Sequence, residues 1–193
     1  MTDEERLEAD FEDLRGRLGD KDSLNPAHGD PIFYFVYSPR QILTVRRLLP
    51  TWIVRLRNQN DLAVETLSLS DVMWKLIDES RRWPAWLEVE SEAEQQEINQ
   101  SVRDVLQASD ALVKQVAKHA MSERPNTILF VLDLEVLHPF FRARAIESYL
   151  NNRVRIPTVF FYPGRRTGQY GLHFLDFYSE DPGYRSTIIG GQR

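Results

Sequence analysis

The sequence predicts an α/β protein with three layers, in which a mixed, mostly parallel sheet of about five to six strands is flanked by helices. Continuous runs of aromatic and β-branched residues are typical of strands buried on both faces, as in the centre of a parallel sheet. Segments with helical apolar spacing alternate with these runs. Near the C-terminus two strands are joined by a segment too short for a parallel crossover, which predicts an antiparallel hairpin.

Length and composition predict a single α/β domain over residues 1–193. A chain of this length can bury one sizeable core, and no linker or internal repeat divides it. The absence of cysteine excludes disulfides and thiolate chemistry and fits a reducing cytoplasm. An acidic N-terminus and the lack of an apolar run of ~20 residues argue against a signal peptide and a membrane span. We therefore expect a cytoplasmic protein that does not bind membranes.

Residues 1–20 predict an N-terminal amphipathic helix. Thr2 and Glu5 form a capping box, and Gly19 is expected just beyond the helix end. The stripe predicted to be buried consists of Leu7, Phe11, Leu14 and Leu18. Residues 21–30 contain proline and glycine and predict a loop.

The sheet core with its helices is predicted over residues 31–193, beginning with a doubly buried strand at Ile32–Tyr37. Residues 38–41 then supply a capping serine, a proline and a glutamine, so this strand passes almost directly into a helix. Helical spacing continues through Pro50, which is expected to kink the helix without ending it.

A second, weaker strand is predicted at Leu62–Leu69, followed by a helix capped by Ser70 or Asp71. Residues 83–86, Trp-Pro-Ala-Trp, predict a turn whose tryptophans pack against the core.

After this turn the sequence predicts one long helix. Ser91 and Glu94 form a second capping box, and an apolar stripe continues to Met121 on an otherwise polar surface.

The last third of the chain supplies the remaining strands. Thr127–Asp133 is predicted to be a buried strand, followed by a helix at Glu135–Asn151. Pro157–Tyr162 and Leu172–Tyr178 are predicted to form the antiparallel hairpin, and Tyr184–Ile189 is a last extended segment.

Charge is segregated along the chain, although the net charge is only −5. Residues 31–60 carry five basic side chains and no acidic one, whereas residues 61–123 carry 13 acidic and 6 basic side chains. This pattern predicts a basic face beside acidic helices, unless the charges simply follow exposed helix surfaces.

No nucleotide-binding motif is present. The first strand-to-helix junction, where nucleotide-binding folds hold phosphate, contains no glycine. Gly164, Gly168 and Gly171 lie in the predicted hairpin and lack the strand-turn-helix context of a dinucleotide site. The sheet is therefore predicted to be Rossmann-like without a nucleotide-binding loop, and no cofactor is expected.

Asp133, at the end of a buried strand, allows two interpretations. It is either a catalytic or metal-binding carboxylate or the N-cap of the next helix, and capping is the commoner use of aspartate at such a position. His138 is expected near the start of that helix, and the four histidines lack metal-binding spacing. We therefore predict no catalytic and no metal-binding residue.

The segment Tyr162–Gly171 is the candidate recognition site. Arg165 and Arg166 are expected to face solvent at the tip of the hairpin, near an exposed tyrosine, and arginine and tyrosine are enriched at interface hot spots. An ordinary polar turn is the alternative. Other arginines near strand ends are expected to extend one positive patch. The candidate partner-binding residues are Gly164, Arg165, Arg166, Gly168, Tyr170, Arg40, Arg142 and Arg185.

Four blocks of this sequence together resemble one protein family, the BrxB family of BREX (bacteriophage exclusion) phage-defence systems. The blocks are residues 31–41, 137–142, 156–166 and 184–187. The resemblance implies a small cytoplasmic bacterial protein without established catalytic activity. It also implies that the protein is encoded with a phosphatase-superfamily protein (PglZ), an ATPase (BrxC) and an adenine-specific DNA methyltransferase (PglX). The expected role is that of an assembly component that binds PglZ directly.

Three function hypotheses follow. The leading one is a non-catalytic adaptor whose arginine-rich rim binds PglZ. The second is a DNA-binding accessory subunit that uses the same arginines on phosphates. The third is an unrecognised enzyme that acts through Asp133 and His138.

Overall fold

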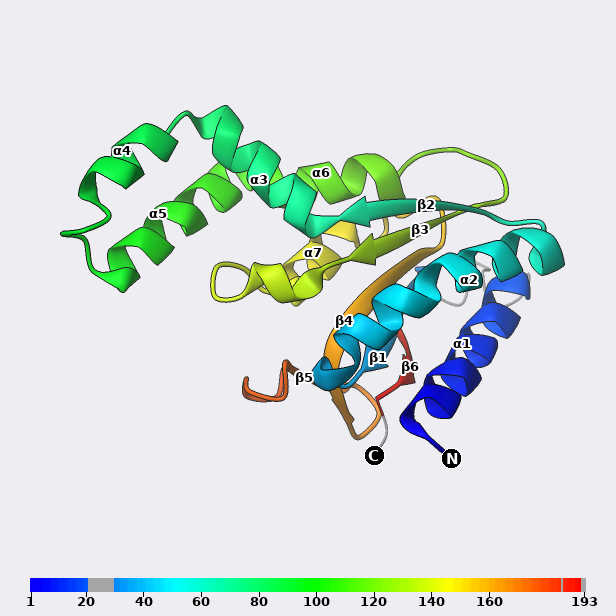
Figure 1. Cartoon of the computed structure of the whole chain (residues 1–193). Helices are drawn as coiled ribbons and strands as arrows, with labels where there is room; N and C mark the ends of the chain where they lie inside the picture. Colours follow the sequence, from blue (N-terminus) through cyan, green and yellow to red (C-terminus); the bar gives the residue numbers. More distant parts are fainter. Residues whose placement is uncertain (21–29, 185, 192–193) are drawn as a thin grey trace.

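The computed structural model describes residues 1–20, 30–184 and 186–191. Within these residues a six-stranded, mostly parallel sheet lies between helices, which confirms the predicted fold class (Figure 1). The strands run in the order β2-β3-β4-β1-β6, and β5 pairs antiparallel with β4 outside this row. The strands are β1 (Ile32–Tyr37), β2 (Ala63–Ser68), β3 (Thr127–Leu132), β4 (Thr158–Thr167), β5 (Gly171–Phe174) and β6 (Thr187–Gly190).

Strand β1 lies in the interior of the sheet. It pairs in parallel with β4 on one side and with β6 on the other, and all six of its residues are buried. Its side chains alternate between two apolar clusters, with Tyr34 on one face and Phe35 on the other. This alternation follows from the two-residue period of a strand and confirms the predicted central parallel strand.

Helices α1 (Asp3–Gly19) and α2 (Ile42–Asn60) cover one face of the sheet. Phe11 of α1 stacks on Trp52 of α2, with ring centroids 4.7 Å apart and an interplanar angle of 5°. α2 follows a single 3₁₀ turn and continues through Pro50, as predicted.

The predicted N-terminal helix is confirmed in most details. Thr2 and Glu5 form the capping box, and the four predicted apolar residues are buried. Gly19 is the last helical residue and Asp20 is the C-cap, so the prediction that Gly19 lies beyond the helix is wrong. All but the last residue of the loop predicted at residues 21–30 lies outside the described residues.

The opposite face of the sheet is covered by α3 (Leu69–Ser80), α6 (Ala111–Ala120) and α7 (Ala143–Leu150). Two further helices, α4 (Trp83–Val89) and α5 (Gln95–Gln107), project beyond the sheet at one end of the molecule (Figure 1). We call these two helices the arm.

The arm and its neighbours differ from the sequence prediction. The single long helix expected up to Met121 is divided into α5 and α6, because Ser109 and Asp110 both have positive φ. The predicted turn at residues 83–86 is instead the start of α4, and Trp83 is 42% exposed where a core contact was expected.

Two predicted caps are also wrong. Glu94 and Glu97 form the capping box of α5, where Ser91 was expected to be the cap. Ser70 or Asp71 was expected to cap α3, but the cap is Ser68. Its hydroxyl accepts a hydrogen bond from the backbone N–H of Asp71 at 3.2 Å.

The helix predicted at Glu135–Asn151 is replaced by two shorter elements. A 3₁₀ helix, η4 (Leu134–Leu137), comes first, then the cis peptide bond between His138 and Pro139, and then α7. The proline interrupts helical hydrogen bonding because it has no N–H group, which explains why one continuous helix does not form.

The C-terminal hairpin is present, but its boundaries differ from the prediction. β4 continues through Gly164, Arg165 and Arg166, so only residues 168–170 form the turn. Gly164 permits the close pairing of β4 with β5, because a Cβ atom at this position would overlap the backbone carbonyl oxygen of His173 on β5. β5 ends at Phe174, earlier than predicted, where the backbone turns into two residues with positive φ.

Candidate functional site

The carboxyl ends of β1 and β4 define the position of the candidate site. Tyr37, the last residue of β1, is paired with Pro163 of β4. From its carboxyl end β1 leads into α2 on one face of the sheet, whereas β3, on the other side of β4, leads into α7 on the opposite face. Connections that diverge to opposite faces leave a crevice outside the strand ends, where α/β proteins bind ligands.

A groove of about 890 Å³ lies at this position, and we call it the arginine groove. It brings together Arg40, which follows β1, and Arg165 and Arg166, which lie on β4. Gly164 also lines it. The convergence of these residues from separate elements agrees with the prediction that strand ends collect arginines.

The three arginines of the groove are held differently. Arg40 makes no hydrogen bond or ion pair with the part of the chain that the structure describes. Arg165 makes a single long ion pair of 3.6 Å with Asp176. Arg166 donates hydrogen bonds to the carbonyl oxygens of Gly168 (3.0 Å), Gln169 (3.2 Å) and Ile188 (3.4 Å). The expectation that Arg166 simply faces solvent is therefore wrong, because its guanidinium holds the turn to β6.

Carboxylates line the same groove. Asp3, Asp10 and Asp13 of α1 and Asp176 from the segment after β5 lie among its walls. Burial, together with the negative charge of Asp13, raises the pKa of Asp10. The groove therefore presents both signs of charge to a binding partner.

The remaining predicted partner residues do not line this groove. Arg142 lines a cavity on the α7 side, where its guanidinium lies 5.4 Å from the ring centroid of Tyr178. Tyr170, 53% exposed, lies in the hairpin turn, and its carbonyl oxygen accepts hydrogen bonds from the N–H groups of Gly183 and Tyr184. Gly168 also lies in the turn, with a positive φ of 58°. Arg185 lies outside the described residues.

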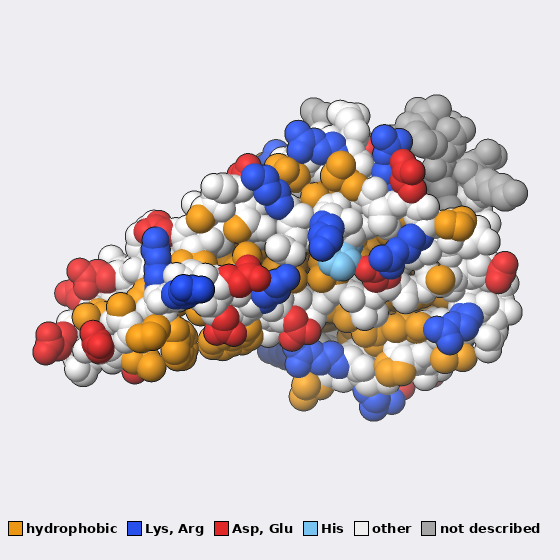
Figure 2. Space-filling view, turned by 90° about the horizontal axis from the view of Figure 1, so that it is seen from above, with side chains coloured by type: hydrophobic (Ala, Val, Ile, Leu, Met, Phe, Trp, Pro, Cys, Tyr) orange, Lys and Arg blue, Asp and Glu red, His pale blue; other side chains and the backbone are white. Residues whose placement is uncertain are grey.

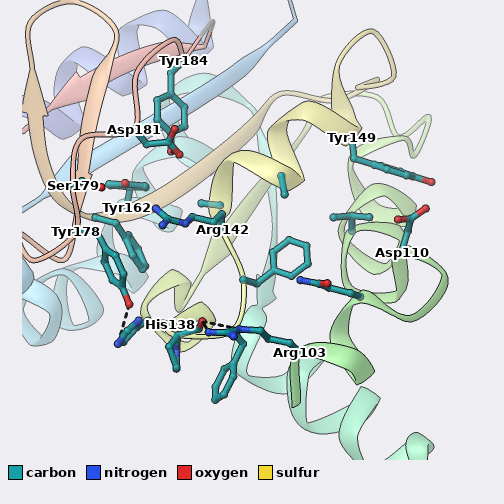
Figure 3. Close-up of a pocket in the computed structure, with 18 residues that line it drawn as sticks. Arg103, Asp110, His138, Arg142, Tyr149, Tyr162, Tyr178, Ser179, Asp181 and Tyr184 are labelled. Atoms are coloured by element: carbon teal, nitrogen blue, oxygen red, sulfur yellow. Dashed lines mark hydrogen bonds between the residues drawn. The ribbon is translucent and has the colours of Figure 1, made fainter. Parts of the chain in front are cut away.

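The cavity on the α7 side encloses about 700 Å³, and we call it the histidine–tyrosine cavity (Figure 3). The Tyr178 hydroxyl and Nε2 of His138 are hydrogen bonded at 3.0 Å, and burial lowers the pKa of His138. Arg103 of α5 donates to the carbonyl oxygen of Pro139 at 3.0 and 3.3 Å. Cationic, aromatic and hydroxyl groups thus face one space.

A buried polar cluster adjoins this cavity through Tyr184, which lines it. Glu147 of α7 is only 6% exposed and accepts hydrogen bonds from Tyr34 (3.4 Å) and Ser186 (2.5 Å). Burial raises the pKa of Tyr34, and the nearby Glu147 charge acts in the same direction. Tyr184 packs edge-on against Tyr34 with ring centroids 4.9 Å apart. These groups are fixed in place by one another, which suits a structural role.

Asp133 occupies the N-cap position of η4, but its side chain does not cap that helix. Its backbone has a positive φ of 60°, and its side chain makes no capping hydrogen bond. Instead the carboxylate accepts hydrogen bonds from Arg46 of α2 (2.9 Å) and from the Ser68 hydroxyl (2.6 Å). It does not line the cavity that contains His138. The predicted N-cap position is therefore confirmed, but the side chain bonds Arg46 and Ser68 in place of the helix, and the structure does not place Asp133 and His138 in one site.

Neither a metal cluster nor a membrane-spanning helix is present among the described residues. No group of three or more histidine and carboxylate side chains there is placed to hold a metal ion. No helix in the same part of the chain combines the length and the apolar character that crossing a bilayer requires.

Fold and site together define an open, mostly parallel α/β protein that has a groove lined by arginines and aspartates at the carboxyl edge of its sheet and no phosphate loop in its sequence. Residues 65–189 match the family model described as BREX protein BrxB. The chain therefore belongs to the BrxB family and is a component of a BREX phage-defence system, as the sequence resemblance implied. No curated protein and no solved structure matches it.

Proposed function

We propose that this protein is a non-catalytic assembly component of its BREX system that binds PglZ through the arginine groove and the adjoining hairpin turn. The observation that carries the proposal is the pair formed by Arg40 and Arg165. Both line one groove, yet the first has no partner among the described residues and the second has one long ion pair. Guanidinium groups that lack a close ionic partner in their own chain are available to bind carboxylates of another protein.

A protein partner suits the groove better than DNA does. The four aspartates that line it would repel phosphates, and the whole chain carries a net charge of −5. A protein surface with both signs of charge complements such walls. DNA binding through the same arginines remains the competing hypothesis, and the experiment below includes it.

The geometry also favours binding over catalysis. Catalysis by general acid and base needs both groups within reach of one substrate, but Asp133 is engaged with Arg46 and Ser68, outside the cavity of His138. Burial raises the pKa of Tyr162 and Tyr184 far above neutrality, so neither is suited to act as a base at neutral pH. We accordingly propose that the protein has no enzymatic activity of its own.

The choice of PglZ follows from the family. BREX proteins act in a common system, and BrxC and PglX are further candidate partners. A central arginine in a protein interface is often a hot spot whose truncation costs about 2 kcal/mol or more. Because 1.4 kcal/mol corresponds to a factor of ten, loss of the Arg165 contact is expected to weaken PglZ binding by roughly 25-fold or more.

Co-purification with quantitative binding tests the proposal. Tagged Arg165→Ala protein is expected to recover much less PglZ than the unaltered protein. Arg124→Ala is the matched control, because Arg124 is also exposed and paired with a carboxylate but precedes β3 at the opposite end of the sheet. Equal recovery of PglZ by both variants would show that the groove is not the contact. Salt-sensitive DNA binding lost only in Arg165→Ala would favour the DNA hypothesis instead.

A further inference from the structure

Three of the four tryptophans of the protein lie together where the arm meets α3. Trp83 packs edge-on against Trp74 and Trp86, with ring centroids 5.6 and 6.3 Å away. Trp74 is 52% exposed and Trp83 42% exposed. Tryptophan is the residue type most typical of interface hot spots, and the exposure of two such rings in contact is unusual on a free surface.

These rings border an apolar groove of about 410 Å³, which we call the tryptophan groove. Its other walls include Met73 and Ile77 of α3 and Val102 of α5. A second hollow of about 350 Å³ shares Trp86 and Ile98 with it. The two hollows are therefore adjacent on the arm.

The surface around the tryptophan groove is acidic. Residues 74–98, which supply many of the groove's walls, carry seven acidic and three basic side chains, a net charge of −4. Glu90 lines the groove itself, and Glu92 and Glu97 line the second hollow. Figure 2 shows acidic and hydrophobic side chains gathered at the end of the molecule that the arm forms. A partner that fills the groove brings its own surface close to these carboxylates. It complements them when positively charged side chains flank its apolar ones.

The walls of the groove come mainly from helices, which favours a helical occupant. Strand addition requires an exposed sheet edge to supply backbone hydrogen bonds, whereas α3, α4 and α5 have their backbone groups engaged internally. A helix satisfies its own backbone and offers apolar side chains at positions i, i+3, i+4 and i+7. α5 has 13 residues, about 20 Å, so it could lie against a helix of similar length.

A second copy of this chain is a poorer occupant. The arginine-rich helix of this protein is α2, and its Arg46, Arg47 and Arg55 already form ion pairs with carboxylates of their own chain. If α2 bound the tryptophan groove of another copy, the ion pairs that these arginines make within their own chain would compete with ion pairs to the glutamates of the other copy.

We propose that the tryptophan groove binds a basic amphipathic helix of a partner protein. This site is separate from the arginine groove, so the protein has two docking faces. The proposal does not depend on PglZ being the partner of the arginine groove, because Arg165 and the tryptophans line different surfaces.

A pair of synthetic peptides tests the charge and shape of the occupant. Both are 14-residue helix formers with leucine at i, i+3, i+4 and i+7, and the remaining positions are mainly lysine in one and mainly glutamate in the other. Fluorescence anisotropy of labelled peptides at physiological salt measures binding to the full chain. We expect the lysine peptide to bind at least 10-fold more tightly than the glutamate peptide. Equal binding of the two, or no binding of the lysine peptide, overturns the proposal.

Matched variants locate the binding. Trp83→Glu is expected to weaken lysine-peptide binding at least 10-fold, whereas Phe177→Glu introduces the same charge at an 81% exposed ring outside the groove and should leave it unchanged. Circular dichroism shows whether Trp83→Glu is folded. If it is not, Leu87→Ser is a second groove variant, at a 54% exposed wall residue, that adds no charge. Equal weakening by Phe177→Glu and the groove variants would show that binding is not located in the tryptophan groove, and it overturns the proposal.

A photo-crosslinking residue at Leu87, in cells carrying the whole BREX gene cluster, then identifies the natural occupant. Cross-linking to a basic, amphipathic helical segment of another protein supports the proposal. Cross-linking to a second copy of this chain, to nucleic acid or to an acidic segment overturns it. Arg165→Ala is expected to leave the Leu87 cross-link and peptide binding intact, which separates failure of this inference from failure of the PglZ proposal.

Discussion

The carboxylate of Asp133 accepts a hydrogen bond of 2.6 Å from the hydroxyl of Ser68, joining the end of β3 to the residue that caps α3. Arg46 donates to the same carboxylate and also to Glu135. Since α2 and α3 lie on opposite faces of the sheet, this cluster connects the two helical layers at the carboxyl edge.

Removing this connection should destabilise the protein. Asp133→Ala is expected to lower the free energy of unfolding by about 1–3 kcal/mol, because Arg46 and Ser68 both lose an acceptor. Urea unfolding followed by circular dichroism measures the change. Asp104→Ala, which removes an exposed carboxylate bonded to Gln100 on the same helix, should change stability by no more than about 0.5 kcal/mol. Equal effects of the two substitutions would contradict the connecting role.

The contact between α1 and α2 should be a major source of stability. Phe11 is fully buried and stacks on Trp52 at 4.7 Å, so Phe11→Ala is expected to cost about 3–5 kcal/mol. Phe177→Ala, at an 81% exposed ring, is the matched control and should cost less than about 0.5 kcal/mol. Thermal and urea unfolding compare the two variants. A loss below 1 kcal/mol for Phe11→Ala would mean that α1 contributes little to the core.

The buried tyrosines predict alkaline instability. Burial raises the pKa values of Tyr34, Tyr37, Tyr162 and Tyr184 above their usual range. Below about pH 10 these tyrosines are protonated in both folded and unfolded states, so they do not make stability pH-dependent there. Above pH 10 the unfolded state loses these protons first, so stability falls as pH rises.

Ultraviolet titration measures tyrosine ionisation directly. The chain has seven tyrosines, and four of them are expected to ionise only when circular dichroism shows unfolding. In urea all seven should titrate together near pH 10. Ionisation of all seven near pH 10 in the folded protein would contradict the burial of this cluster.

Gly164 tests the geometry of the hairpin that carries Arg165. Gly164→Ala places a methyl group against the carbonyl oxygen of His173 and is expected to cost about 1–3 kcal/mol through overpacking. Gly16→Ala is the matched control, because a methyl group there meets no atom within 4 Å and alanine favours a helix by about 0.5–1 kcal/mol. The two substitutions should therefore change the unfolding free energy in opposite directions. Loss of stability in both, or in neither, would contradict this account.

Local patterns predicted most of the fold. The run Ile32–Tyr37 identified a doubly buried strand, because burial on both faces requires every side chain to be apolar or aromatic. Helix ends were predicted less well. The division at Ser109 and Asp110 depends on two residues with positive φ, and neither is a glycine that would mark such a position in sequence.

The candidate site was predicted only in part. Arg40 follows β1, and Arg165 lies on β4 just beyond the part that pairs in parallel with β1, so the two arginines converge at one edge of the sheet, which sequence order can suggest. The pairing of His138 with Tyr178 joins residues 40 positions apart that belong to no common motif, so no sequence signal indicated it. The tryptophan groove was missed because Trp83 and Trp86 were both expected to pack against the core, whereas only Trp86 does so and Trp83 is exposed.

The pairing of β1 with β4 and β6 has a consequence for synthesis on the ribosome. β1 leaves the ribosome early, but its partners begin only at Thr158 and Thr187. At about 5–20 residues per second, this fully buried strand therefore waits for roughly 6–25 seconds before the first of its sheet neighbours is made. During that interval α1 and α2 can cover one of its faces, but both of its edges lack a strand to pair with, so the backbone groups of β1 have no sheet partner on the nascent chain until β4 is made.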